Sequence, residues 1–197
     1  MTWVPDADET SLGFEIRRLG VTTLRGRFDR FAVTIPADAT APGGWGLDLR
    51  VATASVSTGN AARDGRIAGT SWLDATRYPD IVFRSRRIEP LHDIENSLTW
   101  VSGDLTIRGK TREANWEFEL LARAQGETGE LGAQYVGRLE FVPRKWGLGS
   151  ALPLVGPTVT ITLRLLVLAA IRGEENRGTE GAPEDIFAGA TSKGRSA

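Results

Sequence analysis

The chain has 197 residues, a length that predicts one domain with or without an appendage. Apolar residues make up 41% of the chain and charged residues 25%, a balance that excludes a fully disordered protein. The 24 basic and 25 acidic residues give a net charge of -1, which offers no net attraction to nucleic acid or to an anionic membrane surface.

Cysteine is absent and histidine occurs once, at His92. The chain therefore cannot form disulfides, thiol nucleophiles, cysteine-ligated metal centres or multi-histidine metal sites. No serine stands at a recognisable spacing from His92 for nucleophilic catalysis. We expect neither a catalytic residue nor a metal nor another cofactor.

Neither the first residues nor the longest apolar run has the pattern of a signal peptide or of a membrane-spanning helix. The residues from Met1 to Glu9 are acidic and lack the basic and apolar regions of a signal peptide. The longest apolar run, Leu165 to Ile171, is far shorter than the roughly 20 residues that a spanning helix needs. The sequence predicts a cytoplasmic protein without an integral membrane segment.

Apolar and polar residues alternate along most of the chain, as where Phe14 and Ile16 stand between Gly13, Glu15 and Arg17. Strands with one apolar and one polar face have this period, whereas helices repeat near 3.6 residues. The pattern predicts eight strand segments, at about 4–18, 21–35, 46–55, 81–88, 98–108, 114–123, 134–143 and 158–170.

Short turn signals separate most of these segments, which favours an antiparallel meander. Closing such a meander removes its exposed edges. The predicted fold is therefore all-β, an eight-stranded antiparallel up-and-down barrel. Phe28 is out of phase with Phe31, which indicates a bulge or bend near Asp29.

Residues 57–80 interrupt the alternation. Thr58 is placed to cap a short helix that runs to Ile67, and Ser71 to cap a second brief turn that Tyr78-Pro79 stops. We expect this helical insert to lie across one mouth of the barrel as a lid or plug. Arg63 and Asp64 are interpreted as residues that fix the insert.

The last segment, 172–197, is rich in Gly, Glu, Ser and Thr and is predicted to be a disordered tail after a barrel domain at 1–171. In the preceding strand both phases are largely apolar from Leu163 to Ile171. Either the tail covers the outer face of this strand or a partner does, and a homodimer through it is one interpretation.

Several motifs resemble the YceI-like polyisoprenoid-binding family. They are Trp3-Val-Pro-Asp6, Ser11-Leu-Gly-Phe14-Glu-Ile16, Arg25-Gly-Arg-Phe28, Ala54-Ser-Val-Ser-Thr-Gly-Asn60-Ala-Ala-Arg63-Asp64, Arg77-Tyr-Pro79-Asp-Ile-Val-Phe83-Arg-Ser85, Gly103-Asp-Leu-Thr-Ile-Arg-Gly-Lys-Thr-Arg112 and Arg144-Lys-Trp-Gly147. The resemblance covers roughly residues 3–170 in the family's order.

The resemblance implies a lipocalin-like barrel that binds a long apolar lipid, typically a polyisoprenoid such as a prenyl quinone or prenyl pyrophosphate. The sequence departs from the family at two places near the insert. Arg66 stands where the family usually has histidine, and Ser71-Trp72-Leu73 replaces the usual Asp-Phe-Phe.

The expected lipid-contacting residues are the apolar members of the inward phase together with one residue of the insert, and ordinary core packing is the alternative role for each. They are Phe14, Ile16, Phe31, Leu49, Trp72, Phe83, Ile107, Trp116, Phe118, Phe141 and Ile161. An eight-stranded barrel is just wide enough to be filled by such side chains or to hold one slender ligand.

The phase of Phe83 continues through Ser85 and Arg87. These two residues are candidates for a polar end that receives a quinone oxygen or phosphate, with Arg87 as the charged donor. The alternative is that Arg87 has reached the rim and is solvated.

The sequence favours non-catalytic binding, transport or storage of an apolar lipid, because the inward phases contain almost no group that could act as acid or base. One alternative is a filled barrel that acts as an interaction module through its last strand and tail. A less favoured alternative is an enzyme acting on a small apolar substrate.

Overall fold

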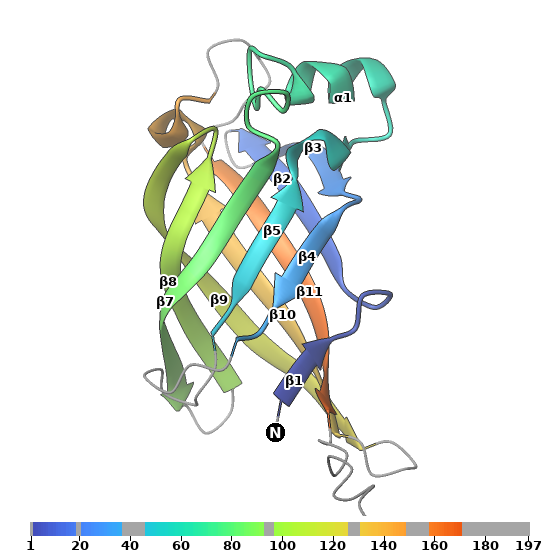
Figure 1. Ribbon diagram of the computed structural model, residues 1–197, viewed down its shortest axis with the longest axis vertical. Helices are drawn as coiled ribbons and strands as arrows, with labels where there is room; N and C mark the ends of the chain where they lie inside the picture. The colour runs from blue at the N-terminus through green and yellow to red at the C-terminus, as the bar shows by residue number, and fades with distance from the viewer. Residues whose placement is uncertain are drawn as a thin grey trace, which may run out of the picture.

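The computed structural model describes residues 2–18, 21–36, 46–92, 97–125, 131–148 and 158–170, and the predicted tail lies outside them. Within these ranges the chain forms one curled antiparallel sheet with a short helix across one end (Figure 1). The strands are β1 (Thr2–Pro5), β2 (Ser11–Arg18), β3 (Val21–Phe28), β4 (Phe31–Thr34), β5 (Asp48–Ala52), β6 (Val56–Ser57), β7 (Asp80–His92), β8 (Ser97–Ile107), β9 (Lys110–Gln125), β10 (Leu131–Phe141) and β11 (Thr158–Ala170). The helices are α1 (Ala61–Ala68) and two 3-10 turns, η1 (Thr53–Ser55) and η2 (Pro143–Trp146).

All of these strands but β6 fall into or overlap the eight segments that the alternation predicts. β1 and β2 share the first segment, and both pair with β11. β2 pairs with the first half of β11, and β1 pairs with the end of β11. β3 and β4 share the second segment, and the bend at Asp29–Arg30 that divides them confirms the expected change of phase. β5 and η1 lie in the third, and β6 follows directly after its predicted end.

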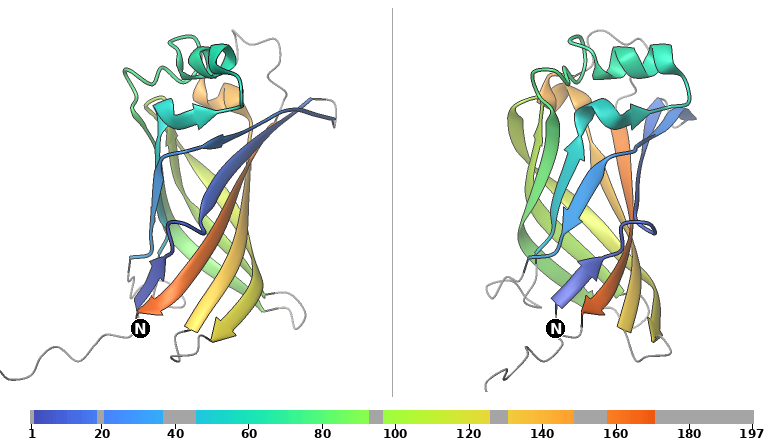
Figure 2. Two further views of the ribbon diagram at one scale, coloured as in Figure 1. Left: turned by 90° about the vertical axis from the view of Figure 1, so that its right-hand side faces the viewer. Right: turned by 45° about the vertical axis from the view of Figure 1, so that its right-hand side comes forward.

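Each neighbouring pair in the sheet is antiparallel, in the order β4-β5-β7-β8-β9-β10-β11-β2-β3-β6. The two ends of this order meet at one corner, because β4 continues from β3 and β6 continues from β5. The lipocalin-like barrel is therefore closed through the chain itself, as two further views show (Figure 2). Of the described residues, none belongs to a helix long and apolar enough to cross a membrane.

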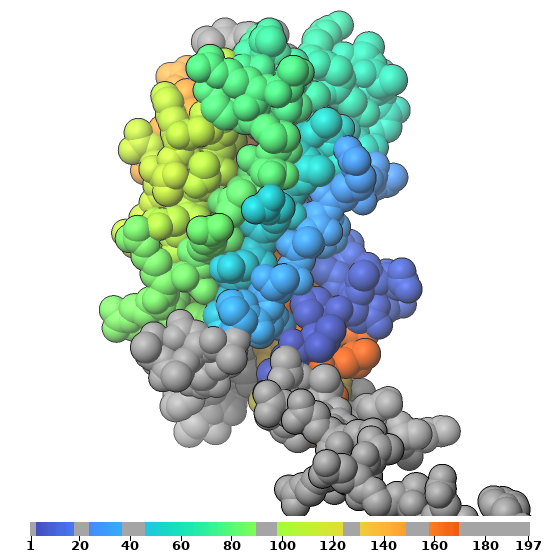
Figure 3. All heavy atoms as spheres, viewed as in Figure 1, coloured from blue at the N-terminus to red at the C-terminus, as the bar shows by residue number. Residues whose placement is uncertain are grey.

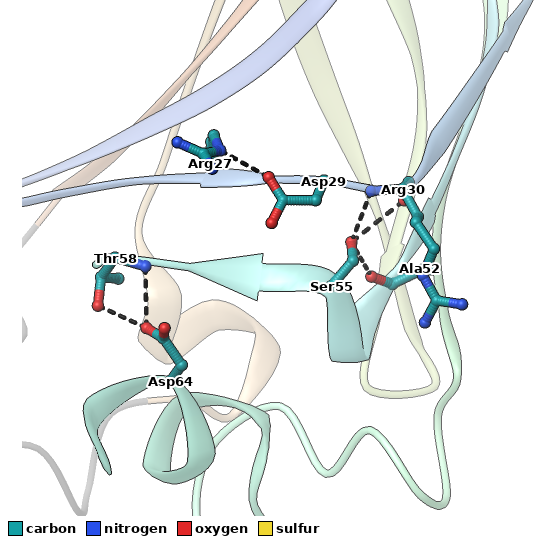
Figure 4. Close-up of polar contacts among 7 residues, drawn as sticks. All are labelled: Arg27, Asp29, Arg30, Ala52, Ser55, Thr58 and Asp64. Carbon is teal, nitrogen blue, oxygen red and sulfur yellow. Dashed lines mark hydrogen bonds and ion pairs between the residues drawn. The ribbon is translucent and has the colours of Figure 1, made fainter. Parts of the chain in front are cut away.

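Ser55 holds this corner together (Figure 4). Its hydroxyl oxygen accepts from the Arg30 amide at 3.1 Å and lies 2.8 Å from the Ala52 carbonyl, to which it donates. The Ser55 carbonyl accepts from the Asp29 amide at 3.0 Å, and the Ala52 amide donates to the Arg30 carbonyl at 2.9 Å. A buried serine thus satisfies backbone groups that the bend takes out of the strand ladder.

On the outer side of the same corner, the Arg27 guanidinium donates to Asp29 at 2.6 Å. The hydrogen bond and the charge of Asp29 raise the pKa of Arg27 above its ordinary value. Since the Arg27 side chain is 71% exposed, this pair is a minor contributor beside the buried serine.

Replacement of Ser55 by alanine should destabilise the protein by about 1–3 kcal/mol, because the Arg30 amide loses its acceptor inside the corner. Urea unfolding of the variant would measure this loss. The matched control is Ser102→Ala, at a half-buried outward position of β8, where a change within about 0.5 kcal/mol is expected. An equal loss in both variants would show that the corner does not depend on Ser55.

Candidate functional site

One end of the barrel is closed by the helical insert, as expected (Figure 1). Ile67 of α1 is 0% exposed, and Trp72 and Leu73 of the following turn are buried beside it. The N-cap of α1 is Asn60, whose side chain accepts from the Arg63 amide at 3.0 Å, so the expected cap at Thr58 is wrong. The helix begins later because Thr58 does not cap it: the Thr58 side chain is hydrogen-bonded to Arg63 and Asp64, which are residues of α1.

Arg63 and Asp64 hold Thr58 in place, and Figure 4 shows the Asp64 side of this contact. Asp64 accepts from both the amide and the hydroxyl of Thr58. The Arg63 guanidinium donates to the hydroxyl oxygen at 2.8 Å and to the carbonyl of Thr58 at 3.1 Å. Both side chains therefore fix the insert to the end of β6.

A second element that the sequence analysis missed, η2, lies at the same end. Trp146 donates its indole N–H to the Leu105 carbonyl at 3.1 Å and packs edge-on against Phe141. Arg112 donates to the Lys145 carbonyl at 2.6 Å, and Arg108 to the Thr70 carbonyl at 2.9 Å. The β8–β9 turn, η2 and the insert are therefore joined into one closed end.

Aromatic rings fill the middle of the barrel. Phe83 meets Trp116 edge-on with ring centroids 6.1 Å apart, and Phe118 stacks on the other side of Trp116 at 5.7 Å. Phe14 and Phe28 form a further pair at 5.6 Å.

Three glycines make room for these rings, since a Cβ atom at each would overlap one ring. The glycine–ring pairs are Gly26 with Phe14, Gly103 with Phe83, and Gly137 with Phe118. Strand glycines that lie against aromatic rings keep the strands close while the ring fills the space of the missing side chain.

The other end holds an open, apolar cavity of about 100 Å³. It is lined by Trp3, Ile35, Leu47, Thr99, Phe118, Tyr135, Leu165 and Val167. These residues lie at the ends of their strands away from α1, as the registers show: Tyr135 faces Leu165, and Phe118 faces Thr99. Phe118 lines the cavity and stacks on the fully buried Trp116, so we interpret its ring as the cavity floor.

The structure places nearly all of the expected lipid-contacting residues in the packed core. Phe31 is partly buried, and the others are buried: Phe14, Ile16, Leu49, Trp72, Phe83, Ile107, Trp116, Phe118, Phe141 and Ile161. Of this set, Phe118 lines the cavity, and Trp72 lies at the closed end.

The remaining cavity residues were not among the expected lipid-contacting residues. Leu47, Leu165 and Val167 belong to apolar strand phases that the alternation makes visible. Alternation shows which side chains point inward, but it does not show where the interior is left unfilled.

The candidate head-group residues are separated by a bulge in β7. Ser85 pairs with Gly103 and Arg87 with Ser102, so Arg86 is an extra residue and the inward phase moves to Ile88. The expectation that Arg87 shares the phase of Phe83 is therefore corrected: its side chain is 69% exposed and pairs with Glu89. Ser85 is half-buried and accepts from the Leu47 amide at 2.8 Å, beside the cavity.

The interior of the described part of the barrel is apolar and uncharged. Among the described residues, Thr10, Thr53 and Ser55 are the buried polar residues, and Thr99 and Tyr135 are the hydroxyl-bearing residues of the cavity lining. Among the described residues, three buried polar atoms have no hydrogen-bond partner: Thr53 Oγ1, Trp72 Nε1 and Trp116 Nε1. The same ranges contain no group of three or more acidic or histidine side chains able to hold a metal ion. Such an interior can receive an apolar chain by burying it, but it offers no ionised group for proton transfer.

The fold and this cavity define a lipocalin-like barrel with an apolar internal site that is open at one end. The family model described as the YceI-like domain matches residues 3–167, and the chain belongs to that family.

Curated relatives include a UPF0312 protein of Shewanella oneidensis, which is 27% identical over 162 residues, 82% of each chain. A UPF0312 protein of Vibrio cholerae is 26% identical over 138 residues, 70% of this chain and 71% of its own.

Two solved structures share the fold. BcnA of Burkholderia cenocepacia superposes with a TM-score of 0.70 at 21% identity, over 83% of this chain and 99% of its own. A polyisoprenoid-binding domain from Saccharophagus degradans superposes with a TM-score of 0.62 at 18% identity, over 86% and 99%.

Replacement of Gly137 by alanine should displace the Phe118 ring and destabilise the protein by about 1–3 kcal/mol through overpacking. The same change in a Phe118→Leu background should cost much less, because the smaller side chain leaves room for the new methyl group. Urea unfolding of the four proteins in this double-mutant cycle measures the coupling.

Gly13→Ala is the matched control, because the nearest atom to its new methyl group would be an ordinary 3.7 Å away. Additive effects of Gly137→Ala and Phe118→Leu would contradict the proposed contact.

Proposed function

We propose that the protein binds a slender apolar lipid, with one end of its chain in the open cavity and no chemistry performed on it. The observation that carries this proposal is the apolar cavity at the end opposite the helical plug, lined on all sides by residues of the sheet or its edges. The YceI-like family and the polyisoprenoid-binding name of one structural neighbour support a prenyl chain as the ligand. Each methylene group that leaves water contributes about 0.8 kcal/mol to binding.

The size of the cavity sets the depth to which such a chain enters. A cavity of about 150 Å³ holds one benzene molecule, so the space of about 100 Å³ takes only a terminal portion of a chain. Deeper entry requires the ring of Phe118 to leave Trp116. A prenyl quinone or prenyl pyrophosphate would then keep its polar head at the open end, near Ser85 and Leu47.

A second candidate is an interaction module whose barrel is filled by its own side chains. The packed rings of Phe83, Trp116 and Phe118 favour it, because they occupy the middle of the interior. The two candidates differ in whether the cavity must stay open for function.

Filling the cavity should therefore abolish lipid binding while leaving the fold intact. In Thr99→Phe the new ring occupies the space beside Phe118, and we expect binding of farnesol, a short prenyl alcohol, to weaken at least tenfold, about 1.4 kcal/mol. Isothermal titration of delipidated full-length protein measures the affinity.

The matched control is Ser102→Phe, which adds the same ring to the outer side of the same strand. It should bind farnesol like the unmodified protein. If Thr99→Phe folds and binds farnesol unchanged, the cavity is not the binding site. If the unmodified protein does not bind farnesol or a straight-chain alcohol, the interaction-module candidate is favoured.

A further inference from the structure

Large apolar side chains are exposed mainly at the cavity end of the barrel. Six such side chains are exposed among the described residues, and five of them lie on the strand halves away from α1: Val4, Trp100, Leu121, Leu131 and Leu168, between 37% and 49% exposed. The sixth, Val142, lies beside η2 at the closed end and is 38% exposed. We call the set of five the mouth collar.

The mouth collar is continuous with the cavity. On three strands a residue that lines the cavity is followed by a member of the collar: Trp3 by Val4, Thr99 by Trp100, and Val167 by Leu168. Val4 and Leu168 are direct cross-strand partners, and Figure 3 shows β1 beside the end of β11 at the foot of the barrel. At these positions an exposed apolar side chain stands next to a residue that lines the cavity, and Glu89 and Glu117 flank Trp100 on the outer face.

Nearer the closed end, outward positions are polar. Thr160 hydrogen-bonds to Glu140 at 3.1 Å, and Arg25 pairs with Glu15 at 2.8 Å. A sheet in water normally alternates between an apolar inner and a polar outer face. The gathering of exposed large apolar side chains around the cavity mouth, among polar outward residues, therefore points to an apolar medium outside the barrel at that end.

We propose that the cavity end of the barrel docks on the surface of a lipid bilayer, with the mouth collar in contact with the lipid. This inference rests on the proposed function in one respect, since it supplies the route by which an apolar ligand reaches the cavity without crossing water. The docking itself depends on the collar and is measured separately.

The arrangement of the collar favours a bilayer over a second copy of the chain. Its members come from five neighbouring strands, β8, β9, β10, β11 and β1, and so follow the curve of the barrel. A partner against one side would touch part of this arc, whereas a bilayer that receives the barrel end contacts all of it. Trp100 also suits an interface, because its ring is apolar and an indole N–H can donate to water or to head groups.

Charges around the collar are of both signs. Trp100 stands between Glu89 and Glu117 in the sheet, and Glu119 lies 3.8 Å from Arg138. Attraction to anionic lipid is therefore not the driving interaction. Docking should occur on neutral phosphatidylcholine and should persist at high salt, where screening removes attraction between exposed charges.

Flotation of the full-length protein with phosphatidylcholine vesicles tests this. The unmodified protein should float with the vesicles at low and high salt, and the double variant Trp100→Ser/Leu168→Ser should partition at least tenfold less. Val142→Ser, which removes an equally exposed side chain at the closed end, should partition like the unmodified protein.

Three results would overturn the proposal. The first is absence of vesicle binding by the unmodified protein, and the second is equal loss in Val142→Ser. The third is a dimer in sedimentation analysis that Leu168→Ser dissociates without any vesicle binding, because the collar would then join two copies. Farnesol titration of the collar variants in solution separates the two proposals, since it reports on the cavity and not on docking.

Discussion

The interior of an eight-stranded barrel is too narrow to hold both a complete set of large inward side chains and a ligand. This protein divides its interior along the axis. Aromatic rings over strand glycines fill the middle, α1 and η2 close one end, and a small apolar cavity remains at the other. The ring of Phe118 lies at the boundary between filled and open space, because it stacks on Trp116 and also lines the cavity.

The closure of the sheet depends on local features at the corner rather than on a long continuous ladder. The bend at Asp29–Arg30 divides one chain segment into β3 and β4. As a result β3 pairs with β2, and β4 pairs with β5. Ser55 supplies the hydrogen bonds that this bend removes from the strands. The insert leaves the sheet immediately after this corner, so the corner and the plug lie at the same end (Figure 4).

The fold was largely predictable because period-two alternation marks each of the eight segments. The bend beside Asp29 was visible as a change of phase between Phe28 and Phe31. The bulge at Arg86 was not, since Ser85, Arg86 and Arg87 are all polar and an extra residue leaves no trace in their pattern. The helix cap was misplaced because Thr58 and Asn60 are both good cap residues, and the choice depends on the contact between Thr58 and Asp64. The cavity could not be located from sequence, because inward phase is a property of one strand and empty space depends on several.

The central claim is that the barrel holds an apolar chain, and the most direct test is to identify what the protein carries. Full-length protein purified from its native host would be extracted with organic solvent, and the extract analysed by mass spectrometry. We predict a stoichiometric lipid with a slender apolar chain, a prenyl lipid in the first instance. Absence of any lipid, both as purified and after incubation with prenyl chains, would contradict the account.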